Sequence, residues 1–209
     1  MKTDVIRIYS DLKGSEEAMA TAEKFCEYNG FEGRNAKHIR LLTEELLSMV
    51  HGIMENFRGD MWFESQKGDE GTLCRICLRA DKAADCFQEE YLLSVASSGK
   101  NENAKGILGK IREAFRVSTQ HANDGVYMNE YTSVNNWFSM GAAMTESASA
   151  RNYRYWSLKD YHRRVYDNRE NAAEELDELE KSIIAKIADD VKVWLRSETT
   201  ELVAEKLIK

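Results

Sequence analysis

The sequence predicts an α+β fold, a two-layer sandwich in which a mixed or antiparallel sheet carries helices on one face. Segments of period-two alternation occur in adjacent pairs, as the strands of hairpins do. Segments of helical period do not alternate with single strands, as βαβ units would require. The 209 residues, 43% of them hydrophobic, are enough to bury one core, so we expect a single domain over 1–209.

The first strand and the first helix are expected within residues 4–30. Asp4–Ser10 is rich in β-branched and aromatic side chains, which favour an extended segment. Ser15 is the expected N-cap of a helix that runs to about Tyr28, and Gly30 follows as a typical terminator. Four side chains recur at helical spacing and should face the core: Ala18, Ala22, Phe25 and Cys26.

A long second helix is predicted over Arg34–Phe57. Its apolar side chains recur at intervals of three and four residues, as one buried helix face requires. They are Ile39, Leu42, Leu46, Met49, Val50 and Ile53. Gly52 interrupts this pattern, and it marks either the close approach of another backbone or the true end of the helix.

A β-hairpin should follow the long helix. Asp60–Ser65 and Thr72–Ala80 are its expected strands, with the loop at Gln66–Gly71. In the second strand the side chains alternate between a buried and a wet face. The buried set is Cys74, Ile76, Leu78 and Ala80, and the wet set includes Arg75 and Arg79.

Periodicity is weaker over 81–171 and clear again towards the end. Tyr91–Ala96 is predicted as a short strand, and Ala104–Val117 and Leu158–Tyr166 as helices. Ala172–Ile187 predicts one amphipathic helix. Its apolar stripe is Leu176, Leu179, Ile183, Ile184 and Ile187.

A second hairpin is predicted to close the chain. Val191–Arg196 and Thr200–Ile208 are its strands. In the first of them Val191 and Val193 should point to one face, and Lys192 and Trp194 to the other.

Composition and charge exclude several classes of protein. The net charge is −7 and basic residues are scattered, whereas nucleic-acid binding needs clustered Lys and Arg. The densest basic group is expected to be a solvated helix face with buried rings: Arg151, Arg154, Arg163 and Arg164, with Tyr153, Tyr155, Trp156 and Tyr161. Met1–Ser10 has no signal-peptide segment, and no apolar run approaches the ~18 residues of a membrane helix. We therefore expect a cytoplasmic protein that binds neither nucleic acid nor membrane.

The cysteine pattern argues against a metal or redox site. With no export signal, the four cysteines are expected to be reduced thiols. Cys74 and Cys77 form a Cys-x-x-Cys pair, but in a strand their odd spacing places them on opposite faces. No second pair follows at ligand spacing, so the sequence predicts no metal site.

Three stretches in this element order are similar to a known family. They are Leu41–His51 on the long helix, Ile76–Asp85 at the end of a hairpin strand, and Leu179–Ile208 with its acidic turn. The chain resembles the histidine-kinase-like ATPase (GHKL) superfamily, and in particular the compact bacterial anti-sigma-factor serine kinases. The resemblance implies a histidine-kinase-like ATPase fold with a divergent insertion at 86–171, which replaces the ATP-lid region.

The resemblance also locates a changed metal ligand. In the family a catalytic Glu on the long helix is followed four residues later by an Asn that coordinates Mg²⁺. Glu45 matches the acidic position, but Met49 stands at the ligand position. A thioether is a soft ligand and a poor match for Mg²⁺. Shifting the frame by one residue pairs Glu44 with Ser48, whose hydroxyl is able to contact Mg²⁺.

Other residues are nucleotide-pocket candidates by resemblance. Asp81 stands where the family's Asp accepts a hydrogen bond from the adenine amino group, while Ala83 and Asp85 replace its glycines. Gly106 and Gly109 offer a candidate phosphate contact, although their spacing is not that of a Walker A loop.

No intact catalytic motif is present, so the sequence predicts binding or regulation more than turnover. The first expectation is a degenerate ATPase domain that binds no cofactor and regulates a protein partner, with a homodimer as one arrangement. The first alternative is a divergent ATP-binding, anti-sigma-factor-type serine kinase, for which ATP, Mg²⁺ and a catalytic Glu45 would be needed. The second is an unrelated α+β protein that binds a small ligand.

Overall fold

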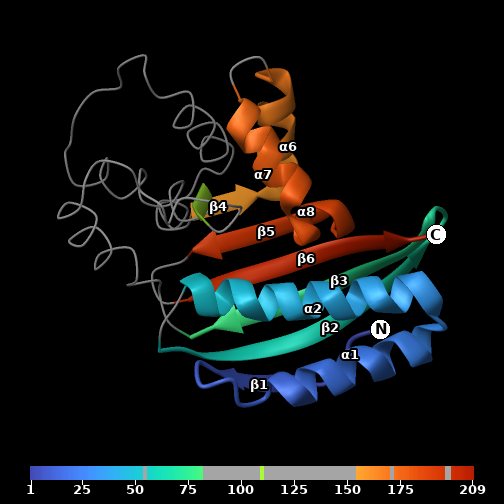
Figure 1. The fold of residues 1–209 in the computed structure, drawn as a ribbon. Helices are drawn as coiled ribbons and strands as arrows, with labels where there is room; N and C mark the ends of the chain where they lie inside the picture. Colours follow the sequence, from blue (N-terminus) through green and yellow to red (C-terminus); the bar gives the residue numbers. More distant parts are fainter. Residues whose placement is uncertain (54–55, 82–108, 111–153, 170–171, 196–198) are drawn as a thin grey trace, which may run out of the picture.

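A computed structural model of the chain describes residues 1–53, 56–81, 109–110, 154–169, 172–195 and 199–209. Within these ranges six strands form one sheet in the order β1-β2-β3-β6-β5-β4, and every neighbouring pair is antiparallel (Figure 1). The elements are β1 (Ile6–Tyr9), α1 (Ser15–Asn29), α2 (Gly33–Ile53), β2 (Arg58–Gly68), β3 (Gly71–Ala80), β4 (Arg154–Ser157), α6 (Leu158–Asp167), α7 (Ala173–Lys181), α8 (Ile183–Ile187), β5 (Asp190–Leu195) and β6 (Thr200–Ile208).

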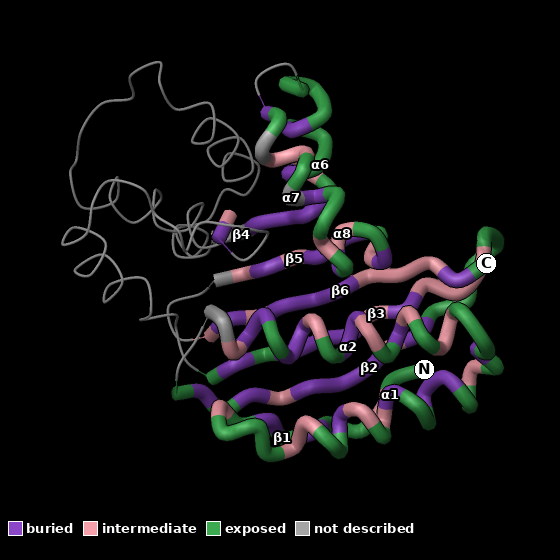
Figure 2. The backbone as a smooth tube through the Cα atoms, in the orientation of Figure 1, coloured by how far each residue is buried: buried purple, intermediate pink, exposed green. Residues whose placement is uncertain are grey.

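The described helices share one apolar core with the sheet. Phe25 of α1, Leu42 of α2, Tyr161 of α6, Leu179 of α7 and Ile184 of α8 all belong to it. The inward side chains of the central strands complete it, and the buried stretches follow β2, β3 and β6 in Figure 2. The predicted α+β class is therefore confirmed, and the described part of the sheet is antiparallel.

The first helix begins differently from the prediction. The N-cap of α1 is Gly14, with a φ of 85° and no side-chain cap, so the assignment of Ser15 as N-cap was wrong. Glycine is required because a Cβ at this position would lie 2.0 Å from the carbonyl oxygen of Arg7. The helix ends as expected at Gly30, whose N–H donates to the carbonyl of Cys26. The predicted inward residues are buried: Ala18, Ala22, Phe25 and Cys26.

The second helix is shorter than predicted. It ends at Ile53, and Phe57 lies outside it with its carbonyl accepting a hydrogen bond from the Ser10 N–H. The chain has to leave the helix before Phe57, because β2 begins at the next residue and pairs with β1. The described members of the predicted stripe are buried as expected: Ile39, Leu42, Leu46, Met49 and Val50.

The first hairpin is longer and tighter than predicted. Its strands pair up to Gly68 and Gly71, so the six-residue loop expected at Gln66–Gly71 is wrong. The residues added to the strands at this end are polar or glycine, and period-two hydrophobicity does not detect them: Gln66, Lys67, Gly68 and Gly71. Gly71 has a φ of 138°, and a Cβ there would lie 2.3 Å from the carbonyl oxygen of Ile208. Only glycine allows this approach of β6.

The segment 172–187 is two helices and not one. Ser182 leaves helical geometry between α7 and α8, and its side chain accepts a hydrogen bond from the Ala185 N–H. The interruption changes which side chains of the predicted stripe face the core. Ile184 and Ile187 are buried, whereas Ile183 is 48% exposed. Ser182 is thus an internal N-cap that the hydrophobic stripe concealed.

Strand β4 was not predicted from the sequence. It forms the sheet edge next to β5, and its last residue, Ser157, caps α6, the helix predicted at Leu158–Tyr166. Buried Asp190 accepts hydrogen bonds from Ser157 Oγ at 3.0 Å and from the Lys159 N–H at 3.0 Å. Trp156 is buried in the core, so its ring belongs to the core and not to an aromatic–arginine surface.

Several other sequence predictions fall outside the described residues. These are the strand at Tyr91–Ala96 and most of the helix at Ala104–Val117, of which Gly109 and Lys110 are described and helical. Residues 154–169, within the predicted insertion 86–171, form β4 and α6. In the part of the chain that the structure describes, no helix is both long and apolar enough to cross a membrane.

The other face of the sheet is covered by its own charged side chains. Arg75 contacts Glu205 at 3.0 Å, and Lys192 contacts the same carboxylate at 2.7 Å. Lys2 and Arg79 lie over the ring of Trp62, at 4.5 Å and 5.8 Å from its centroid. These long side chains bury a short apolar row: Trp62, Cys77 and Val203, with Trp194 against it.

The ion pairs of Glu205 predict a pH dependence of stability. Burial acts to raise the pKa of Glu205, but hydrogen bonds from Lys192 and Arg75 outweigh it and hold the pKa below its ordinary value of 4.5. A carboxyl whose pKa is lowered by folding stabilises the folded state above its unfolded pKa and loses this contribution as the pH falls through the folded value. Urea unfolding at a series of pH values below about 5 should therefore show a smaller acid-induced loss of stability in Glu205→Gln.

Glu70→Gln is the matched control for this experiment. Glu70 is exposed in the turn of the first hairpin and forms no ion pair among the described residues. The Glu70→Gln variant should show the same pH dependence of stability as the wild type. If Glu205→Gln also showed the wild-type pH dependence, the lowered pKa of Glu205 would be contradicted.

Three buried thiols predict low cysteine reactivity. Cys74 and Cys77 lie on opposite sheet faces, as predicted. Burial raises the pKa of Cys26 to about 11 and those of Cys74 and Cys77 to about 12. Because the thiolate is the reactive form, these groups should resist labelling at neutral pH. In Cys86→Ser, we expect a disulfide-exchange reagent to label these thiols only after denaturation. Rapid labelling in native buffer would show that they are not buried.

Candidate functional site

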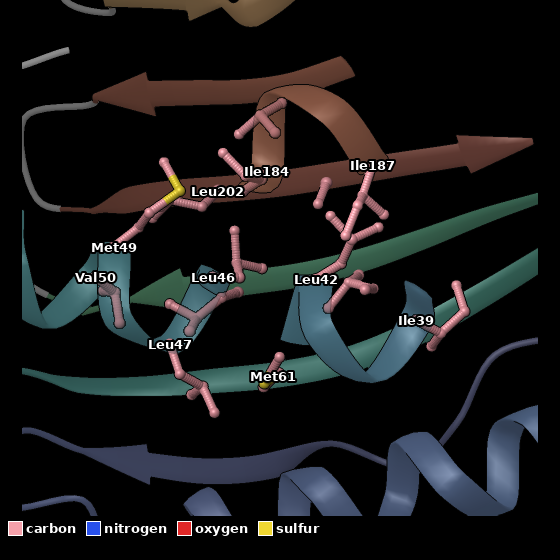
Figure 3. Close-up of a cluster of buried hydrophobic side chains, with 14 of the residues drawn as sticks. Ile39, Leu42, Leu46, Leu47, Met49, Val50, Met61, Ile184, Ile187 and Leu202 are labelled. Carbon is pink, nitrogen blue, oxygen red and sulfur yellow. The ribbon is translucent and has the colours of Figure 1, made fainter. Parts of the chain in front are cut away.

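Helix α2 carries four of the residues selected from the sequence, and it presents them on different flanks: Glu44, Glu45, Ser48 and Met49. The stripe that holds Met49 faces the sheet and α8. Met49 is 3% exposed and lies close to Ile184 and Leu202 in the core (Figure 3). Glu45, one turn earlier, is only partly buried, and it does not line the hollow described below.

The packing of Met49 determines what this flank is able to bind. Its thioether contributes to the same apolar cluster as Leu42 and Leu46 of the preceding turns (Figure 3). A cation at this position would have to enter the apolar core and would find a soft sulfur as its ligand. Within the described ranges, no group of three or more His, Cys, Asp or Glu side chains is arranged to hold a metal ion.

The opposite flank of α2 borders an open hollow of about 960 Å³. The hollow lies between α2, α1 and the loop that joins β1 to α1. Ser48 and Glu44, the pair in the shifted frame, both line it. The complete lining is Ser10, Leu12, Ser15, Glu16, Met19, Ala20, Glu23, Arg40, Glu44, Leu47, Ser48 and His51.

One arginine connects the two helices at this hollow. The Arg40 guanidinium donates from Nη1 to Glu23 of α1 at 2.9 Å and from Nε to Glu44 of its own helix at 3.4 Å. The three side chains are about half exposed, so each ion pair contributes roughly 0–1 kcal/mol. Glu16 also lines the hollow, and no ion pair of its carboxylate occurs among the described residues.

The rim of the hollow displays a leucine in an unfavourable backbone conformation. Leu12 has a φ of 69°, the left-handed region that costs most non-glycine residues about 1 kcal/mol or more. Two of the hydrogen bonds in this loop involve the Leu12 backbone: its N–H donates to the Tyr9 carbonyl, and its carbonyl accepts from the Ser15 N–H. Despite its apolar side chain, Leu12 is 63% exposed.

His51 is packed and not poised for chemistry. Its Nδ1 lies 2.6 Å from the Leu47 carbonyl oxygen, and its ring contacts Phe57 at a centroid distance of 5.2 Å. Both Nε2 of His51 and Oγ of Ser15 are buried without a hydrogen-bond partner. Because these two atoms are covered, a ligand in the hollow would not reach them without a local rearrangement.

The remaining nucleotide-pocket candidates lie elsewhere. Asp81 follows β3 and accepts two hydrogen bonds from Arg58, from its N–H at 3.1 Å and from its Nε at 2.7 Å. It does not line the hollow with Ser48. Gly109 is a buried residue of a helical segment, and the candidates Ala83 and Gly106 lie outside the described residues.

Apart from Ser48 and Glu44, sequence reasoning did not select the charged and apolar residues that line the hollow. Leu12, Glu16, Glu23 and Arg40 carried no motif. The spacing of Arg40 and Glu44 was the one available signal, because residues four apart on a helix pair with each other. Their proximity to Glu23 arises only from the packing of α1 on α2.

Neither a family model, nor a characterised protein, nor a solved structure matches the chain.

The conformation of Leu12 predicts an unusual mutational effect. Leu12→Gly should raise the free energy of unfolding by roughly 0.5–1 kcal/mol, because glycine adopts positive φ freely. Lys13→Gly, one residue later, should lower the free energy of unfolding by a similar amount. The φ of Lys13 is not positive, so glycine there relieves no strain and only gives the unfolded chain more freedom. Urea unfolding measures both, and an equal loss of stability in the two variants would contradict the strain at Leu12.

Proposed function

We propose that the chain is a degenerate histidine-kinase-like ATPase domain that does not hydrolyse ATP and serves as a regulatory, protein-binding module. The order of the elements supports the proposal. The first five elements, a strand, two helices and a hairpin, come in the order on which the resemblance to the family rests. After the intervening segment, the chain adds strand β4 and helices α6, α7 and α8 before its closing pair of strands. The proposal includes a homodimer as one arrangement of the module.

The single observation that carries the loss of hydrolysis is the burial of Met49. Phosphoryl transfer relies on a metal ion and on the positioning of the reacting groups, with little covalent chemistry from the protein. At the position where the family places its Mg²⁺ ligand, this chain has a side chain that is 3% exposed and packed in the apolar core near Leu202 (Figure 3). Restoring a metal site would require both a new ligand and a different helix packing.

The contacts of Asp81 favour the same conclusion. Its two carboxylate oxygens accept hydrogen bonds from Arg58, so an adenine amino group would compete with a guanidinium for this acceptor. The divergent anti-sigma-factor-type kinase remains the alternative, with Glu45 and Asp81 as its functional residues. Both side chains are at least partly exposed, which this alternative requires.

A second alternative is supported by the hollow itself. The hollow has a volume of about 960 Å³ and both apolar and polar lining residues, and this volume is typical of a small-ligand site. The unrelated α+β ligand-binding protein would use this surface and not the flank of α2 that faces α8. A small ligand that bound there without any effect of nucleotide would favour this alternative.

The proposal predicts no stabilisation by nucleotide. Calorimetric titration and thermal unfolding with ATP and ADP, with and without Mg²⁺, should show neither binding heat nor a shift in Tm. A nucleotide present at a hundred times its Kd would stabilise the protein by about 2.7 kcal/mol, which is readily measured. Binding that Asp81→Ala abolished and Asp69→Ala, at the exposed hairpin turn, retained would instead establish the kinase alternative.

A further inference from the structure

We propose that the hollow between α1 and α2 docks an amphipathic segment of a partner protein that carries Arg or Lys beside leucine-type side chains. The inference rests on the proposed function for one premise, that the chain binds another protein. It adds the surface that is used and the chemistry of the segment that fits it.

The charge of the hollow selects a basic partner. Three carboxylates, those of Glu16, Glu23 and Glu44, line it against the single guanidinium of Arg40, which leaves a formal charge of −2 with His51 neutral. Arg40 is already shared between Glu23 and Glu44, whereas Glu16 has no ion pair among the described residues. An arginine or lysine of the partner would therefore find free acceptors, and complementary charge across an interface favours encounter and specificity.

The apolar part of the lining suits the neighbouring side chains of such a segment. Leu12, Met19, Ala20 and Leu47 all line the hollow. Leu12 is held at the rim, 63% exposed, in a backbone conformation that leucine disfavours. Strained residues persist where the surrounding structure enforces them, often at binding surfaces. Covering Leu12 with an apolar partner side chain would remove it from water.

Two competing interpretations fit the same surface less well. Nucleotides and phosphopeptides would bring negative phosphates towards the three glutamates of the hollow. The other face of the sheet is a poorer docking surface, because its charges are already paired with one another, as in Arg75–Glu205–Lys192 and Arg79–Glu201. Separating those pairs would remove favourable contacts, whereas Glu16 at the hollow has no ion pair with any residue that the structure describes.

The test uses the full chain, labelled with ¹⁵N, and a short synthetic peptide of Leu and Arg with helical amphipathic spacing. Amide shifts should change at residues 10–23 and 40–51 and not on the hairpin of β2 and β3. The affinity should fall as salt is added, because exposed charges are screened. A peptide with Glu in place of Arg serves as the charge control and should not bind.

Two matched pairs of variants then separate docking from general effects. Glu16→Lys should weaken binding by about fivefold or more, since it reverses a charge in the hollow, whereas Glu17→Lys should not. Both glutamates are exposed in the first turn of α1, but only Glu16 lines the hollow. Leu12→Gly should weaken binding by about tenfold without loss of stability, whereas Lys13→Gly should leave the affinity unchanged.

Each result decides the inference. Binding with both expected differences supports it, and failure of the Leu–Arg peptide to bind overturns it. Equal weakening by Glu16→Lys and Glu17→Lys also overturns it, because the effect would then be one of net charge. These outcomes are separate from those of the nucleotide experiments. ATP hydrolysis would refute the proposed function and leave the peptide-binding data valid. If neither the peptide nor nucleotide bound, the docking inference would be refuted and the absence of ATP hydrolysis would still stand.

Discussion

The burial of one apolar stripe of α2 holds the two halves of this protein together. Leu42, Leu46 and Met49 come from the N-terminal part of the chain, and they meet Ile184 and Leu202 from the C-terminal part in one cluster (Figure 3). The sheet makes the same connection, since β3 pairs directly with β6. Each fully buried apolar side chain of this kind contributes about 1.5–3 kcal/mol, a large share of the roughly 5–15 kcal/mol that stabilises a typical domain.

This packing also limits the function of α2. Under the proposed function, the flank where the family holds its metal ion is occupied by the core, because Met49 is 3% exposed and belongs to the apolar cluster. The opposite flank borders α1 and contains the polar and charged residues of the hollow. One flank of α2 thus contributes to the core, and the proposed docking surface uses the other.

Charge is distributed unequally over the two exposed sides of the fold. On the sheet face opposite the described helices, neighbouring strands place opposite charges side by side, and these side chains also cover Trp62 and Cys77. At the hollow, acidic residues exceed basic ones and Glu16 has no described ion pair. With a net charge of −7 for the whole chain, surplus negative charge is expected. Its placement beside exposed Leu12 distinguishes the hollow from an ordinary solvated surface.

The sequence by itself determined the α+β class, the buried stripes and the opposite facing of Cys74 and Cys77, because these depend on periodicities within single elements. It did not reveal the N-cap at Gly14, the break at Ser182 or the strand β4. Each of these depends on a contact made by residues distant in sequence or on a local hydrogen bond that hydrophobicity does not report. The candidate site divides in the same way: Ser48 and Glu44 were visible as a spaced pair on one helix, but the partnership of Arg40 with Glu23 exists only because α1 packs against α2. Spacing along the chain determines which face of a helix a residue occupies, and only the tertiary structure decides what lies opposite that face.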